Sequence, residues 1–278
     1  MHYPHKYELL IQYLAGLGGV AVAFSGGVDS TFLLKAAHDA LGDRAIAITA
    51  RSFGFPVREL NEASDFCKKE GIRHFICETE ELKIEDFEHN PPNRCYLCKN
   101  ELLTKIRALA GEQGIVHIAE GTNKDDDTED RLGFAAVQEH GIKSPLRHVG
   151  FTKQEIRDIS KELGLPTWNK QSFACLFSRF PYGETITAER LSMIDKAEQF
   201  LLDSGFVQVR VRYHNNLARI ETDQTGFHLL ENRALRETIH ATFKQIGFTY
   251  ITLDLQGYRT GSMNEGIIHG LPERGDNE

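Results

Sequence analysis

Short apolar runs alternate with longer segments of helical spacing over the first part of the chain. The apolar runs lie at 20–24, 45–50, 72–77 and 115–119, and runs of this length are typical of buried parallel strands. Helical spacing and end signals, including a capping box from Thr152 to Glu155, predict helices over 6–15, 31–37, 56–69, 98–113 and 152–163. Strands that alternate with helices indicate an α/β fold with a doubly wound parallel sheet.

The pattern changes after about residue 183. Val207, Val209 and Val211 alternate with polar residues, which predicts a strand over 206–213 that pairs with a strand over 217–221. Helices over 188–202 and 227–245 and a strand over 249–255 complete a small α+β unit. We therefore expect domains at 1–183 and 184–270, followed by a disordered tail at 271–278.

The loop after the first strand reads Ser25-Gly26-Gly27-Val28-Asp29-Ser30 and leads into a helix. Such a junction presents backbone N–H groups at the positive end of a helix dipole, where phosphate binds. Gly26 and Gly27 allow close approach of the backbone, Ser25 and Ser30 add hydroxyl donors, and Asp29 can hold Mg²⁺. Neither Gly-Lys-Ser/Thr nor G-x-G-x-x-G occurs here, so this is neither a Walker A loop nor a dinucleotide fingerprint.

The loop resembles the PP-loop of the ATP pyrophosphatases, which cleave ATP between its α and β phosphates. The alternative interpretation is an ordinary tight turn between a strand and a helix. Ligands of parallel sheets bind at the carboxyl ends of the strands, and the segments 49–52 and 120–127 fall at the same edge as the loop. The acidic residues Glu120 and 125–127 either hold Mg²⁺ there or form a solvated loop.

Composition narrows the function classes. The chain has 278 residues, 41% of them hydrophobic, and a net charge of −8, which argues against binding to bulk nucleic acid. No apolar stretch approaches the roughly 20 residues of a membrane span, and the first residues lack the apolar region of a signal peptide. We therefore expect a cytoplasmic protein.

Three of the five cysteines stand out. Cys67 and Cys77 lie in apolar patterns and are expected to be buried thiols, so a disulfide framework is not expected. Cys95 and Cys98 form a C-x-x-C pair, and Cys175 could join them from far along the chain. The three could hold a four-iron, four-sulfur cluster with one open iron; the alternatives are structural zinc with His89 as fourth ligand, or a redox dithiol unrelated to Cys175.

Two further groups carry candidate chemistry. Lys99 follows the cysteine pair and would be a charge partner for a cleaving ATP, or simply a solvated lysine. Arg210 and Arg212 share the polar face of one expected strand, Arg219 is expected on its neighbour, and Arg259 follows the last strand. Converging arginines suit a phosphate or carboxylate, whereas scattered ones are ordinary surface residues.

Taken together, these stretches resemble the LarE family of the PP-loop superfamily, which inserts sulfur during synthesis of the nickel-pincer nucleotide cofactor. The matching stretches cover both expected domains: AFSGGVDST at 23–31, RCYLCKNEL at 94–102, EGTNKDD at 120–126, SRFPYGETIT at 178–187, VRVRYHNNLARIE at 209–221 and TLDLQGYRTGSMN at 252–264.

The resemblance implies an ATP- and Mg²⁺-dependent sulfurtransferase that adenylates pyridinium-3,5-biscarboxylic acid mononucleotide and replaces the AMP with sulfur. It implies that the segment carrying Gly121, Asp125 and Asp126 helps to hold the nucleotide, and that Ser178 and Arg179 lie near the substrate. Arg210, Arg212 and Arg259 match an anion or metal site of the family. A homo-oligomer is also implied.

The family has two sulfur sources. In one, a single cysteine that matches Cys175 gives up its sulfur; in the other, three cysteines hold an iron–sulfur cluster. The presence of Cys95, Cys98 and Cys175 resembles the cluster version. Two other functions stay open: a tRNA-thiolating PP-loop enzyme, and an ATP-binding regulatory protein with structural zinc.

Overall fold

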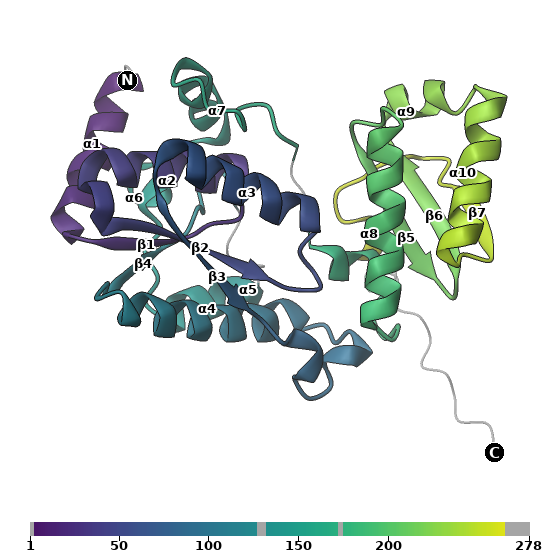
Figure 1. Ribbon diagram of the computed structural model, residues 1–278, viewed down its shortest axis with the longest axis horizontal. Helices are drawn as coiled ribbons and strands as arrows, with labels where there is room; N and C mark the ends of the chain where they lie inside the picture. The colour runs from purple at the N-terminus through teal and green to yellow at the C-terminus, as the bar shows by residue number, and fades with distance from the viewer. Residues whose placement is uncertain (1–2, 127–131, 172–174, 265–278) are drawn as a thin grey trace. The chain divides into compact units, whose positions relative to one another are not determined.

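The computed structural model describes residues 3–126, 132–171 and 175–264 (Figure 1). The chain divides into two compact units. The first consists of residues 1–83 and 93–173, and the second of residues 84–92 and 174–278. Residues 84–92 and 174–183 thus group with the second unit, whereas the sequence placed them before the expected boundary at 183/184. That boundary stays a prediction of where independent domains meet.

The first unit is built on a four-stranded sheet in the order β3-β2-β1-β4. All neighbouring strands are parallel, which confirms the predicted α/β fold. The strands are β1 (Val20–Ala23), β2 (Ala45–Arg51), β3 (Arg73–Glu78) and β4 (His117–Ala119). Alternate residues of these strands enter two separate apolar clusters, so both faces of the sheet are buried.

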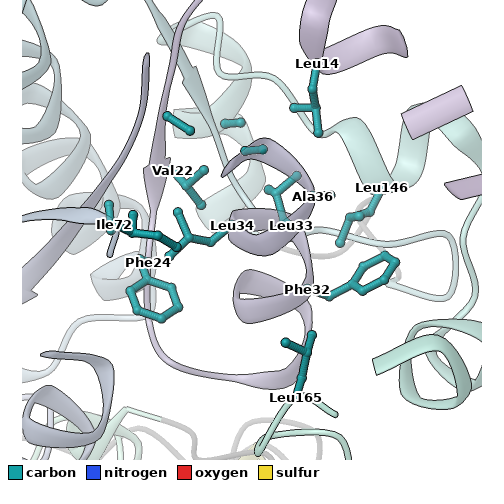
Figure 2. Packing of buried hydrophobic residues seen from close by; sticks show 14 of the residues in the cluster. Leu14, Val22, Phe24, Phe32, Leu33, Leu34, Ala36, Ile72, Leu146 and Leu165 are labelled. Atoms are coloured by element: carbon teal, nitrogen blue, oxygen red, sulfur yellow. The ribbon is translucent and has the colours of Figure 1, made fainter. Parts of the chain in front are cut away.

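Helices cover each face of this sheet (Figure 1). One face packs against α1, α2, α3, α6 and α7, and the other against α4 and α5. Phe32 of α2 contacts Phe151 edge-on at 5.4 Å between ring centroids, and Figure 2 shows Phe32 and Leu146 pointing toward each other. The helices are α1 (Tyr3–Leu17), α2 (Val28–Leu41), α3 (Val57–Glu70), α4 (Arg94–Glu112), α5 (Leu132–Glu139), α6 (Pro145–Val149) and α7 (Lys153–Glu162).

The second unit holds a three-stranded sheet in the order β5-β6-β7. β5 (Val209–His214) and β6 (Leu217–Thr222) form a hairpin, and Asn215 and Asn216 at its tip have φ of 47° and 65°, as a type I′ turn requires. β7 (Tyr250–Leu253) runs parallel to β6. The helices of this unit are α8 (Ala188–Asp203), α9 (Gln224–Leu229) and α10 (Arg233–Ile246).

Short 3₁₀ turns connect these elements. They are η1 (Gly42–Arg44), η2 (Glu81–Lys83), η3 (Phe87–His89), η4 (Leu176–Arg179) and η5 (Ser262–Asn264).

Three expected elements are corrected. The helix expected over 227–245 is two helices, because Asn232 caps a new one by accepting hydrogen bonds from the N–H groups of Ala234 and Leu235. The strand expected from 206 begins at Val209, since Val207 is 54% exposed and lies outside the sheet. The helix expected from 98 begins at Arg94 and therefore includes the C-x-x-C pair.

Several expectations concern features outside the sheets. None of the five cysteines, all in the described part of the chain, forms a disulfide. Among the described residues, no helix combines the length and the apolar character that crossing a membrane requires. The expected disordered tail at 271–278 lies outside the described residues, and the cytoplasmic location stays a prediction.

Candidate active site

The loop from Ser25 to Ser30 joins the end of β1 to the first turn of α2. Gly26 has a φ of +65°, and a Cβ on it would lie 3.4 Å from the Cβ of Ala63 on α3, so the position favours glycine. Gly27 is the N-cap residue of α2 and no side chain caps this end. The first N–H groups of α2 are therefore available as hydrogen-bond donors to an anion.

Two hydroxyl groups meet inside this loop. The Oγ atoms of Ser25 and Ser30 lie 3.1 Å apart, and Ser30 Oγ also donates to the carbonyl of Gly27 over 3.2 Å. Ser30 is buried and Ser25 is exposed. The loop thus has one hydroxyl that holds its shape and one that faces solvent, which suits a phosphate site.

Asp29 connects the loop to the segment after β4. Its carboxylate accepts a hydrogen bond from Nδ2 of Asn123 over 3.3 Å and pairs with the ammonium of Lys153. A Cβ at Gly121 would lie 3.1 Å from the backbone N of Ser30, so Gly121 allows this segment to pack against α2. The structure therefore brings the loop, Gly121 and Asp29 together at the carboxyl edge of the sheet, as predicted.

The acidic residues of this edge mainly order the backbone. Asp126 accepts from the N–H of Asn123 over 3.0 Å, and Asp125 accepts from the N–H of Lys153 over 2.7 Å. Glu120 accepts from the hydroxyls of Thr122 and Ser144. Asp127 lies outside the described residues. These contacts explain an ordered loop, and its binding of Mg²⁺ stays a prediction.

Cys95 and Cys98 lie in the first two turns of α4, on one side of the helix at i and i+3. The Cys98 thiol donates to Oε1 of Glu81 over 3.8 Å, and Glu81 is 2% exposed. A Cβ added at Gly133 on α5 would lie 3.3 Å from Cδ of Lys99, so the Lys99 side chain passes close to α5. The C-x-x-C pair and Lys99 thus belong to the first unit, on the face of the sheet that α4 covers.

Cys175 and the candidate zinc ligand His89 belong to the second unit, where His89 has a side-chain exposure of 63%. Within residues 3–126, 132–171 and 175–264, no group of three or more His, Cys, Asp or Glu side chains is arranged to hold a metal ion. The cluster ligated by Cys95, Cys98 and Cys175 and the zinc site with His89 therefore stay predictions, and we derive no reaction step through either.

The backbone of Cys175 contacts two residues that the resemblance placed near the substrate, Ser178 and Arg179. Its carbonyl accepts hydrogen bonds from Ser178 Oγ at 2.7 Å and from Arg179 Nη1 at 3.3 Å. Arg179 is fully buried and forms a bidentate pair with Glu198, at 2.7 and 2.9 Å. These contacts place Cys175, Ser178 and Arg179 in one group within the second unit.

Arg210 and Arg212 are also buried, so neither is an ordinary surface residue of the expected polar strand face. Arg212 pairs with Glu221 at 2.7 Å and donates to the carbonyl of Ser178 at 3.1 Å. Arg210 is 2% exposed and its guanidinium lies 5.2 Å from the ring centroid of Tyr258. Burial, followed by the charge of Arg179, lowers the pKa of Arg210.

Arg219 faces Arg212 across the hairpin, as expected, and Arg259 pairs with Asp254 at 3.2 Å. Within the described part of the chain, this cluster brings together five arginines and three carboxylates: Arg179, Arg210, Arg212, Arg219 and Arg259 with Glu198, Glu221 and Asp254. The excess of positive charge suits an anionic ligand.

Known proteins are similar in sequence to this chain over nearly its whole length. No protein-family model matches the chain. The chain is, however, 35% identical to the pyridinium-3,5-bisthiocarboxylic acid mononucleotide synthase of Lactiplantibacillus plantarum. The similarity extends over 265 residues, which are 94% of this chain and 95% of that relative. The chain belongs to the LarE family.

Other relatives fit the same assignment. This LarE protein is 43% identical over 260 residues to an uncharacterised protein of Synechocystis, covering 93% of this chain and 97% of the relative. It is also 30% identical over 165 residues to the argininosuccinate synthase of Haloarcula marismortui, covering 54% of this chain and 38% of that protein. The parallel sheet is thus that of the PP-loop superfamily, and membership of the LarE family makes the chain an enzyme.

Three residues at the site of this LarE protein were missed from the sequence: Asn123, Lys153 and Lys170. The capping box at Thr152 and Glu155 is present, so it correctly placed Lys153 at the first position of α7. Nothing in the sequence indicated that this position faces Asp29, because that contact joins residues 124 positions apart. Lys170 similarly reaches the loop from 144 positions away.

Proposed function

We propose that this LarE protein is an ATP-dependent sulfurtransferase that acts on pyridinium-3,5-biscarboxylic acid mononucleotide. The observation that carries the proposal is the PP-loop, whose uncapped helix N-terminus combines with Ser25 and Asp29 in one loop. The substrate class rests on the named relative in Lactiplantibacillus plantarum.

The reaction consists of two displacements. A carboxylate oxygen of the nucleotide attacks the α-phosphorus of ATP, the bond to the β-phosphate oxygen breaks, and pyrophosphate leaves with that electron pair. A sulfur nucleophile then attacks the acyl carbon, and AMP leaves with the original carboxylate oxygen. One oxygen of the substrate is thereby exchanged for one sulfur.

The chain's own residues can stabilise the negative charge that develops on the phosphates in the first step. The N–H groups at the start of α2 and the hydroxyls of Ser25 and Ser30 bind the departing pyrophosphate. Gly121 lets the segment after β4 pack closely against the start of α2, and Asp125 and Asp126 order that segment. Lys99 offsets negative charge on the phosphates. Mg²⁺, when bound, would neutralise phosphate charge, and the carboxylate of Asp29 with phosphate oxygens is a donor set that fits it.

The arginine cluster of the second unit is proposed to bind the anionic substrate. Ser178, Arg179, Arg210, Arg212 and Arg259 supply the donors, and the Cys175 carbonyl is tied to the first two. An anion bound by Ser178 and Arg179 would lie beside the backbone segment that carries Cys175. This arrangement favours Cys175 as the position from which sulfur is delivered.

The sulfur source is proposed to be a four-iron, four-sulfur cluster ligated by Cys95, Cys98 and Cys175. The pair on α4 fits two ligands, because i and i+3 thiols face the same side of a helix. Anaerobic reconstitution followed by iron and sulfide analysis tests it. Loss of one sulfur atom from Cys175 per turnover, with an active Cys95→Ala variant, would instead support a sacrificial cysteine.

The test of the overall function is a product assay. The protein is incubated with ATP, Mg²⁺, sulfide and the biscarboxylated nucleotide, and the products are analysed by mass spectrometry. We expect thiocarboxylate, AMP and pyrophosphate in equal amounts. Sulfur incorporated into tRNA, with none in the nucleotide, would assign the chain to tRNA thiolation instead. We also propose a homo-oligomer, which light scattering of the purified protein would test.

A further inference from the structure

Lys170 reaches the PP-loop from the segment after α7. Its ammonium donates to the carbonyl oxygen of Gly26 over 3.1 Å and pairs with Glu59 at 2.7 Å and Glu62 at 2.6 Å on α3. Only 14% of the Lys170 side chain is exposed, and Glu59 is exposed by 3%. An ammonium group has three protons, and these three acceptors can use all of them.

The contact at Gly26 fixes the direction of the next N–H group. The peptide between Gly26 and Gly27 is trans, since no described peptide bond is cis. In a planar trans peptide the carbonyl and the N–H point in opposite directions. A carbonyl directed at Lys170 therefore turns the Gly27 N–H away from the Lys170 ammonium.

This peptide needs an anchor more than most others do. Glycine on both sides of it removes the Cβ contacts that normally restrict rotation of a peptide plane. Gly27 is also the N-cap residue of α2 without a side-chain cap. Without the Lys170 contact, rotation of the peptide would exchange an N–H donor for a carbonyl oxygen, which repels phosphate.

We infer that Lys170 is a positioning residue that holds the Gly27 N–H in the orientation that donates to pyrophosphate and to the β and γ phosphates of ATP. Its own charge is offset by Glu59 and Glu62, so it acts through the loop rather than as a phosphate ligand. This inference rests on the proposed ATP-dependent function.

Lys6 offers a matched control in the same unit. Its ammonium also donates to one backbone carbonyl, that of Gly150 at 3.0 Å, and to a carboxylate, that of Glu155 at 2.7 Å. Its side chain is likewise 14% exposed. Lys6→Met and Lys170→Met therefore remove similar contacts, but only Lys170→Met removes one from the PP-loop.

The experiment measures ATP-dependent pyrophosphate release and its inhibition by added pyrophosphate, with urea unfolding in parallel. We expect both variants to lower the urea midpoint similarly. Lys170→Met should raise the KM for ATP and the inhibition constant for pyrophosphate by at least about tenfold, as expected for loss of a charge-assisted contact. Lys6→Met should leave both constants within about twofold of the wild type, and Lys170→Arg should restore most of the affinity.

Equal constants for the two methionine variants would overturn the inference. A wild-type protein that releases no pyrophosphate with ATP and the nucleotide would instead reject the proposed function. A second measurement needs no variant: the Gly27 amide signal of the wild type should shift strongly downfield in NMR spectra when pyrophosphate is added. An unmoved Gly27 signal under saturating pyrophosphate would also overturn the inference.

Discussion

Nδ2 of Asn123 donates a hydrogen bond to Oδ1 of Asp29 over 3.3 Å, which joins the segment after β4 to the first turn of α2. Asn123 is 3% exposed, so this contact is buried at its donor end. Asp29 also pairs with Lys153 at the start of α7. Three segments that are distant in the sequence therefore fix one carboxylate beside the PP-loop.

Asp29→Ala should abolish function without unfolding the protein. The carboxylate is a proposed Mg²⁺ ligand, and losing a preorganised charged group at a phosphate site costs at least about 100-fold in rate. The Asp29–Lys153 pair is partly exposed, so its loss should cost no more than about 1 kcal/mol of stability. Pyrophosphate release and urea unfolding measure the two effects.

Asp39→Ala is the matched control, since Asp39 is an acidic residue of the same helix that pairs with Lys35. It should leave the rate within about twofold of the wild type, because its partners, Lys35 and the hydroxyl of Tyr7, lie outside the PP-loop. A rate of Asp29→Ala that equals the rate of Asp39→Ala would contradict the assignment of the PP-loop.

Glu198→Ala should strongly destabilise the second unit. Glu198 pairs with Arg179, whose side chain is fully buried, and it also accepts from the N–H of Val211 at 2.8 Å. Removing one partner of a buried pair leaves an uncompensated charge and costs about 3–5 kcal/mol. Glu237→Ala, which breaks the exposed pair with Arg233, should cost under about 0.5 kcal/mol, and urea unfolding monitored by circular dichroism compares the two.

The first unit should lose stability as the pH falls below 6.5. Burial lowers the pKa of His74 from its ordinary 6.5. The unfolded chain therefore binds the proton first, so stability is full above pH 6.5 and declines as the pH falls toward the lowered pKa of the folded state. The imidazole Nε2 lies 2.8 Å from Oγ1 of Thr49, whose hydroxyl donates to the carbonyl of Phe24.

Because Thr49 uses its proton on Phe24, Nε2 of His74 is the donor in their contact, and protonation would add a charge at Nδ1. His74→Gln keeps an N–H donor but does not titrate. Burial also lowers the pKa of His214 in the second unit. Because His214 is present in both proteins, its contribution cancels when the wild type is compared with His74→Gln. The urea midpoint should fall further in the wild type between pH 7.5 and 5.5; equal slopes would assign the loss to other groups.

The sequence predicted the first unit well, because its signals are local. Apolar runs specify buried strands, and the capping box at Thr152 and Glu155 correctly begins α7. The helix expected over 227–245 was wrong, since helical spacing continues through 230–232 while the Asn232 side chain caps a new helix. Local spacing alone could not distinguish one helix from two.

The position of the candidate site on the sheet was predicted correctly, its contacts were not, and the roles of its residues stay predictions. The PP-loop lies at the predicted edge of the sheet, but Lys153 and Lys170 were missed because tertiary packing alone brings them to it. Arg210 and Arg212 were expected on a polar strand face, and the structure buries both. The carboxylate partner of Arg212, Glu221, lies on the neighbouring strand, a pairing that composition does not reveal.

The five cysteines should react with iodoacetamide in two distinct groups. Burial raises the pKa of the Cys67 thiol to about 12 and that of Cys77 to about 11, so at pH 7.5 both are protonated and sterically protected. Cys95 and Cys175 are exposed, and Cys98 is intermediate. In the native aerobic protein, mass spectrometry should therefore find rapid labelling at Cys95 and Cys175, slower labelling at Cys98, and none at the buried pair until urea is added.

The same labelling applied after anaerobic reconstitution with iron and sulfide tests the cluster. Ligation by a cluster removes the thiolate from reaction, so Cys95, Cys98 and Cys175 should become protected together, and any one Cys→Ala variant should leave the other two labelled. Cys67→Ala is the control and should not change that protection, because a buried thiol of this pKa is not a ligand. Protection of Cys95 and Cys98 alone, with Cys175 still labelled, would contradict a three-cysteine cluster and would leave Cys175 to supply its own sulfur.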